Sequence, residues 1–188
     1  TWAIDAVANH AVRSMPMSKW LKTCRELEEG LSATDHRQFE KALTILGGLL
    51  GAQSSKPSGK GRADSVWIFH EFWVSLEAKS ETTSTGPVDM SEVRQANTQL
   101  KSVSGDRGEA VPPGSISLII SPKQLTDPDA AAIAEPHLYL CSPADMQSLA
   151  RDVIEAWRTI RAEAMNVSPQ GATNAIQQAL SDRQVLPT

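Results

Sequence analysis

Residues 64–80 read DSVWIFHEFWVSLEAKS, an apolar stretch with Asp64 at its start and Glu77 and Lys79 at its end. Branched and aromatic residues favour β-structure, so the stretch predicts two strands joined by a tight turn. The predicted strands cover residues 66–69 and 72–79, and the turn lies at His70 and Glu71. An acid therefore opens the first strand, and an acid and a base close the second.

The alternation of side chains along the second strand places its charged residues together. Trp73, Ser75, Glu77 and Lys79 lie on one face of such a strand, because successive side chains point to opposite sides. Glu77 and Lys79 are then two residues, or roughly 6.5 to 7 Å, apart along the strand. Both side chains can reach one bound ion, water or phosphate from there.

Helices and further strands surround this hairpin. Asp35 and Gln38 have the spacing of a capping box at the start of one helix, and Gly51 is a natural stop signal for it. The run SISLIIS at 115–121 is typical of a central buried strand. The other elements predicted are helices at about 18–29, 89–103, 128–135 and 143–165 and a strand at 137–142. This order predicts an α/β sandwich with a mixed central β-sheet.

Composition places the chain among ordinary globular proteins. Its 188 residues suffice for one well-buried domain, and 40% are hydrophobic and 21% charged. Cys24 and Cys141 match no zinc pattern, so we expect buried thiols and no disulfide framework. No signal peptide opens the sequence and no apolar run approaches about 18 residues, so we expect a cytoplasmic protein without a membrane span. Thr1 in place of an initiator Met fits processing or excision from a longer polypeptide.

A short basic loop precedes Asp64. Residues 51–62, GAQSSKPSGKGR, contain Lys56, Lys60 and Arg62 and no acid. The net charge of −4 argues against a protein that coats nucleic acid indiscriminately, but it leaves local contact open. The loop is interpreted either as a solvated flexible segment or as a substrate-binding segment.

Four segments, in this order and spacing, resemble the PD-(D/E)XK nuclease superfamily, which has the restriction-endonuclease-like fold. They are FEKALTILGGLLG (39–51), GRADSVWIF (61–69), WVSLEAKSE (73–81) and SEVRQANTQL (91–100). The resemblance covers about residues 35–160 and implies a nuclease-like α/β core over 35–165. Residues 1–34 then form an N-terminal helical extension, and residues 166–188 a C-terminal tail with one weak helix. Ala63 stands at the position of the proline for which the family is named, and many members lack that proline.

The resemblance implies a role for each matching residue of the hairpin. Asp64 and Glu77 would ligate one or two Mg²⁺ ions, helped by the carbonyl of Ala78. Lys79 would orient or polarise the attacking water. Mn²⁺ is expected to be able to replace Mg²⁺.

Two predicted helices complete the implied site. Glu40 would join the metal site directly or through water, and Gln95 would help to hold the site together. The helix that carries Glu40 also has a face nearly free of bulk, which indicates the close approach of another element. This face contains Glu40, Thr44, Gly47, Gly48 and Gly51. Packing against the sheet is favoured over contact with DNA, and either would bring Glu40 towards Glu77.

Elementary chemistry makes the implied site plausible. Hard divalent cations prefer carboxylate and carbonyl oxygens, and Mg²⁺ keeps several waters, one of which can act as the nucleophile. The cation lowers the pKa of that water, and a nearby ammonium group adds to the stabilisation of negative charge in the transition state. Without a cation the carboxylates of Asp64 and Glu77 repel each other, so raised carboxylate pKa values are expected.

Two functions follow as alternatives. The leading hypothesis is a Mg²⁺-dependent deoxyribonuclease, an endonuclease domain of a restriction, repair or defence protein, with DNA as substrate and RNA as the alternative. Other domains of a longer polypeptide and a second copy of the chain are further candidate partners. The competing hypothesis is a catalytically inactive nuclease-like module that binds nucleic acid through the basic loop, or docks a protein.

Tryptophan and histidine residues receive separate interpretations. Trp73, predicted on the same face as Glu77, is the tryptophan that we expect to contact substrate. The four histidines show no ligand spacing, so they are interpreted as structural or surface residues and Ser/His/Asp hydrolysis is unsupported. They are His10, His36, His70 and His137.

Overall fold

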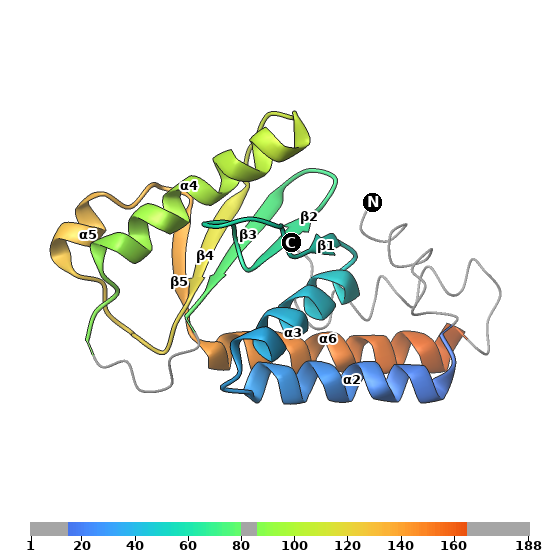
Figure 1. The fold of residues 1–188 in the computed structure, drawn as a ribbon. Helices are drawn as coiled ribbons and strands as arrows, with labels where there is room; N and C mark the ends of the chain where they lie inside the picture. Colours follow the sequence, from blue (N-terminus) through green and yellow to red (C-terminus); the bar gives the residue numbers. More distant parts are fainter. Residues whose placement is uncertain (1–14, 80–85, 165–188) are drawn as a thin grey trace.

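The computed structural model describes residues 15–79 and 86–164, which fold into a five-stranded sheet with helices on both faces (Figure 1). The strands are β1 (Gln53–Ser55), β2 (Ser65–Ile68), β3 (Trp73–Ala78), β4 (Ile116–Ile120) and β5 (Leu138–Cys141). The helices are α2 (Met17–Ser32), α3 (His36–Leu49), α4 (Met90–Arg107), α5 (Pro128–Ala132) and α6 (Pro143–Ala164). The predicted α/β class with a mixed sheet is confirmed.

The sheet has the order β1-β2-β3-β4-β5 and changes direction at β3. The pairs β1–β2 and β2–β3 are antiparallel, whereas β3–β4 and β4–β5 are parallel. The parallel step from β3 to β4 is made through α4, as a crossover requires. Ser65 pairs with Leu76 at the open end of the hairpin, and the backbone N–H of Asp64 donates to the same Leu76, the residue before Glu77.

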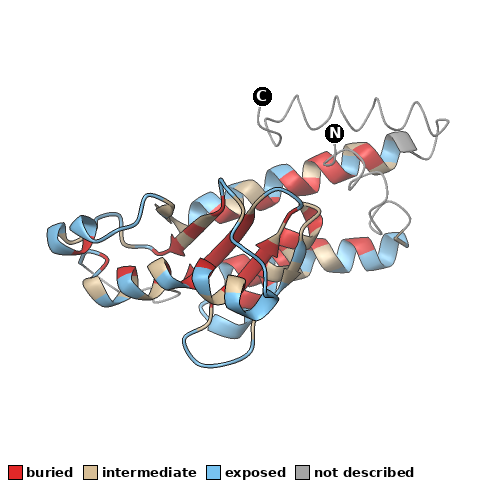
Figure 2. Cartoon of the chain, turned by 90° about the horizontal axis from the view of Figure 1, so that it is seen from above, coloured by how far each residue is buried: buried red, intermediate tan, exposed pale blue. Residues whose placement is uncertain are grey.

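Two helical layers cover the sheet. The helices α2, α3 and α6 pack on one face, where their apolar side chains form one cluster with Val74, Leu76 and Ala78 of β3. On the other face α4 packs against Trp73 and Ile119, and α5 joins it (Figure 1). All six residues of β3 are buried, and buried strand segments lie at the centre of the sheet in Figure 2, whereas the edge strands β1 and β5 contain no buried residue. The hairpin therefore holds its terminal acids on a rigid support.

The start and the sheet-facing side of α3 follow the sequence pattern. The Asp35 side chain accepts a hydrogen bond from the Gln38 N–H at 2.9 Å, which fixes the first turn. A Cβ added at Gly47 would lie 2.3 Å from Cδ1 of Trp67, so only glycine allows this approach of α3 to β2. The small face of the helix is thus a sheet-packing surface, and it carries Glu40 to the end of the hairpin.

Three features differ from the sequence expectation or extend it. Residues 53–55 belong to the loop that the sequence predicts over 51–62, but in the structure they pair with β2 as an edge strand. Helix α4 continues to Arg107 and ends at Gly108, whose φ of 66° suits glycine. Of the predicted extension over residues 1–34, α2 is the described part, and its buried side chains belong to the same cluster as those of α3 and α6. The predicted tail over residues 166–188 lies outside the described residues.

Neither cysteine forms a disulfide; Cys24 is buried and Cys141 is partly buried. Among the helices that the structure describes, none has the length and apolar character needed to cross a bilayer.

Candidate functional site

Asp64 is anchored at the open end of the β2–β3 hairpin. Its backbone N–H donates to the Leu76 carbonyl at 2.9 Å, and its Oδ2 accepts the N–H of Ala78 at 2.8 Å. The Asp64 carboxylate thus takes the place of a backbone carbonyl as acceptor for the Ala78 N–H, and β3 fixes its position. This leaves Oδ1 to face α3.

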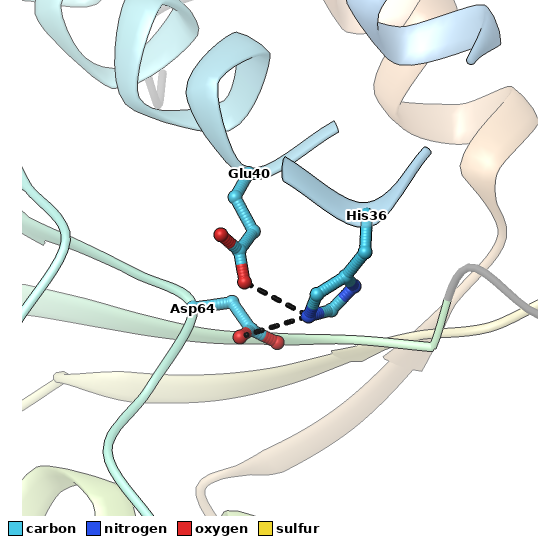
Figure 3. A group of neighbouring side chains, drawn as sticks. All are labelled: His36, Glu40 and Asp64. Atoms are coloured by element: carbon cyan, nitrogen blue, oxygen red, sulfur yellow. Dashed lines mark ion pairs between the residues drawn. The ribbon is translucent and has the colours of Figure 1, made fainter. Parts of the chain in front are cut away.

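Helix α3 brings two side chains to Asp64 (Figure 3). His36 Nε2 lies 2.8 Å from Glu40 Oε1 and 3.5 Å from Asp64 Oδ1. His36 and Glu40 are four residues apart in the helix, so they share one face. Glu40 is 4% exposed, and its Oε2 accepts from the ammonium of Lys56 in the basic loop. One donor atom from each of His36, Glu40 and Asp64 lies within 4.8 Å of the others.

A second group surrounds Glu77 on the α4 side of the sheet. Its Oε1 accepts from Gln95 Nε2 at 2.7 Å and from Lys79 Nζ at 2.9 Å. Its Oε2 accepts from Gln99 Nε2 at 3.2 Å, and the same Nε2 donates to the Gly61 carbonyl. Gln99 Oε1 is buried without a partner in the described part of the chain. The Glu77 carboxylate thus fixes two amides of α4 and ties the basic loop to the sheet.

The two groups meet at the hairpin end. The carboxylate of Asp64 accepts the N–H of Ala78, the residue between Glu77 and Lys79. The negative charge of Glu77 also acts on Asp64 and raises its pKa. The structure thus brings Glu40, Asp64, Glu77, Lys79 and Gln95 to one end of the sheet. Glu77 does not belong to the tight donor group formed by His36, Glu40 and Asp64.

Burial and charge set the ionisation of the two central acids in opposite directions. Burial raises the pKa of Asp64 to about 6, and the nearby Glu77 charge adds to the rise, while the Ala78 N–H opposes it. For Glu40 burial also favours the neutral acid, but the Lys56 ammonium, the hydrogen bond with Asp64 and the charge of His36 together lower its pKa. Near pH 6 Glu40 is therefore ionised, and Asp64 is the acid of this pair that binds a proton.

This raised pKa predicts that the metal-free protein gains stability as the pH falls from 8 to 5. An aspartate has a pKa of about 3.9 in the unfolded chain, so between about pH 4 and 6 the folded state binds the proton more tightly. The gain is lost as the pH rises through 6. Down to pH 5 it amounts to about 1 kcal/mol, because pH 5 lies only about one unit below the folded pKa.

Urea unfolding with a chelator present, at several pH values, measures this effect for wild type and Asp64→Asn. The variant is expected to lack this part of the pH dependence and to be the more stable protein at pH 8. Parallel stability–pH curves for the two proteins would contradict the assignment.

The other predicted substrate-binding residues have different positions. Lys60 is exposed and makes no hydrogen bond or ion pair with the described residues. Arg62 donates to Asp106 at 2.8 Å and to the Ser102 carbonyl at 3.3 Å, which joins the basic loop to α4. Lys56 is paired with Glu40, although its side chain is 51% exposed.

The prediction that Trp73 contacts substrate is wrong in this structure. Trp73 is 2% exposed and packs with Leu100 and Val103 of α4. The guanidinium of Arg107 lies over the indole ring, 5.4 Å from its centre. Alternation placed Trp73 on the correct face, but α4 covers that face here.

Two residues of the site were not found from the sequence. His36 was interpreted as structural or surface, yet its Nε2 faces both Glu40 and Asp64. Its spacing of four from Glu40 was the available signal, but Asp64 joins them only through tertiary structure. Gln99 was missed as well, although it lies one helical turn after Gln95 and contacts the same carboxylate.

Comparison of the chain with protein-family models, curated proteins and solved structures finds no match.

Proposed function

We propose that the chain is a divalent-metal-dependent nuclease that hydrolyses phosphodiester bonds of DNA, on a restriction-endonuclease-like sandwich. The observation that carries the proposal is the grouping of Asp64, Glu77 and Lys79 at one hairpin end, with Glu40 and Gln95 reaching it from two helices. The order of a helix, three strands, a helix and a fourth strand parallel to the third agrees with the order on which the sequence resemblance rests.

The residues present fit a hard divalent cation. Glu40 and Asp64 each offer a carboxylate oxygen on the side of His36, and both carboxylates are largely shielded from solvent. Glu77 stands beside them, and the Ala78 carbonyl remains a predicted ligand. A bound Mg²⁺ supplies an activated water and neutralises charge on the phosphate. Mn²⁺ has the same oxygen preference and is the natural substitute.

The chain's own groups have complementary tasks. Lys79 Nζ, held at 2.9 Å from Glu77, donates to the attacking water or to a phosphate oxygen and stabilises negative charge. Gln95 and Gln99 keep the Glu77 carboxylate in one orientation. Lys60 is exposed in the basic loop and suits a phosphate contact. Lys56 could leave its ion pair with Glu40 and bind a phosphate instead, if a cation neutralised the Glu40 carboxylate.

Cleavage of plasmid DNA with Mg²⁺ or Mn²⁺ tests the proposal, with a chelator as the blank. Lys79→Met is expected to lower the cleavage rate by about 10²- to 10⁴-fold, because it removes a positioned proton donor and its charge. Lys22→Met is the control, since Lys22 lies on α2, its side chain is 76% exposed, and it pairs with Glu26 at 3.8 Å. It should retain the wild-type rate within a few-fold.

Equal cleavage by wild type and the Lys79 variant would contradict the proposal. The alternative, an inactive binding module, predicts no metal-dependent cleavage by any of the three proteins. It also predicts DNA binding that weakens steeply as salt increases.

A further inference from the structure

We propose that His36 is a metal ligand, and that with Glu40 and Asp64 it gives this end of the sheet a preference for a first-row transition-metal ion over Mg²⁺. His36 is not among the site residues that the sequence resemblance implies. His36 contributes a nitrogen donor to a site otherwise composed of oxygen donors and a lysine.

The geometry brings three donor atoms to one point (Figure 3). His36 Nε2 faces Glu40 Oε1 and Asp64 Oδ1, and the three atoms lie within 4.8 Å of one another. Atoms on one octahedral ion at about 2.1 Å are separated by roughly 3 to 4 Å, so only a small contraction is required. The cation would take the place between the imidazole nitrogen and the two carboxylate oxygens.

The second oxygen of each carboxylate provides an independent indication. Glu40 Oε2 accepts from the Lys56 ammonium, and Asp64 Oδ2 accepts from the Ala78 N–H. Each acid is thus oriented by a protein donor on one oxygen and presents the other oxygen to His36. Metal ligands are commonly oriented in this way by outer hydrogen bonds. The histidine side chain is 48% exposed, which leaves a path for a hydrated ion from solvent.

The donor set decides the preference. Imidazole nitrogen binds first-row transition ions well, whereas Mg²⁺ favours oxygen ligands and keeps its waters. A site with two carboxylates alone would accept Mg²⁺ and Mn²⁺ with little discrimination. Addition of His36 raises the affinity for the transition ion selectively. Its use in catalysis rests on the proposed nuclease function, but the binding itself does not.

Mn²⁺ alone and Mg²⁺ alone are the probes, each titrated into the whole chain by calorimetry, with Mn²⁺ binding also followed by electron paramagnetic resonance. His36→Ala is expected to weaken Mn²⁺ binding about tenfold or more. Loss of a residue that only hydrogen-bonds a metal ligand already lowers metal affinity by about that factor. The Mg²⁺ affinity should change much less, so the ratio of the two affinities falls. His70→Ala is the matched control, because His70 lies in the exposed turn at the other end of the β2–β3 hairpin.

A measurement on the unmodified protein guards against a folding defect of the variant. Substoichiometric Mn²⁺ should broaden the NMR signals of the His36 ring before those of His70. Unbroadened His36 signals, or an unchanged affinity ratio in His36→Ala, would overturn the inference. Plasmid cleavage separates the two proposals. Cleavage that depends on Lys79 but not on His36 would support the nuclease and reject His36 as a ligand. Mn²⁺ binding that depends on His36, without any cleavage, would support the metal site and reject the nuclease.

Discussion

If the chain is the proposed nuclease, Glu77→Gln is expected to lower plasmid cleavage by at least about a thousandfold, because it removes a negative charge that would stabilise the cation and the transition state. Glutamine keeps the volume of glutamate but has one acceptor oxygen. Three donors, from Lys79, Gln95 and Gln99, now converge on this carboxylate. The amide cannot satisfy all of them, so the lysine ammonium is left without its counter-charge.

The measurement is the initial rate of supercoiled plasmid loss, with circular dichroism melting to establish that the variant is folded. Glu109→Gln serves as the matched control, since Glu109 forms an ion pair with Arg107 on the surface and its side chain is 55% exposed. A folded Glu77→Gln protein that cleaves at the rate of Glu109→Gln would remove Glu77 from the chemistry.

Gly47→Ala and Gly48→Ala are expected to change stability in opposite directions. At Gly47 the new methyl group would lie 2.3 Å from Trp67 Cδ1 and 2.7 Å from Ser54 Oγ. Trp67 is 4% exposed and donates from Nε1 to the Leu43 carbonyl at 3.0 Å, so its indole has no room to move. Overpacking and loss of this hydrogen bond should cost about 3 kcal/mol in total.

At Gly48 a methyl group meets no atom within 4 Å, so the variant should be more stable by about 0.5 to 1 kcal/mol through helix propensity alone. Urea unfolding of both variants measures the difference. The Gly47 variant should also show reduced cleavage, because Glu40 lies on the same helix, two turns before the contact. A Gly47→Ala protein as stable as Gly48→Ala would mean that α3 does not approach β2 this closely.

The sequence predicted the elements that local pattern controls. Alternation in residues 72–79 assigned the faces of β3 correctly, and Asp35 marked the start of α3. It missed β1, because Gln53–Ser55 pairs with β2 only as a short edge strand and its composition is that of a loop. Edge pairing depends on the partner strand, which local sequence does not encode.

The candidate site was predictable in part for the same reason. Asp64, Glu77 and Lys79 come from one hairpin, so their proximity follows from strand geometry and a short turn. The approach of His36 depends on how α3 lies across the sheet, which the contact of Gly47 with Trp67 determines. Trp73 shows the reverse case, because its face was predicted but the helix that covers it was not.

The packing of α6 against α2 and α3 bears on the order in which the chain acquires structure. Gln147 donates to the Leu31 carbonyl across a separation of 116 residues, and Trp157 to the Leu49 carbonyl across 108. Contacts of such long range slow folding, since the chain must close large loops before the contacts form. During synthesis the acid-bearing hairpin leaves the ribosome well before α6, the last helix of its supporting layer. The layer that supports Asp64 and Glu77 can therefore be completed only after α6 has been translated.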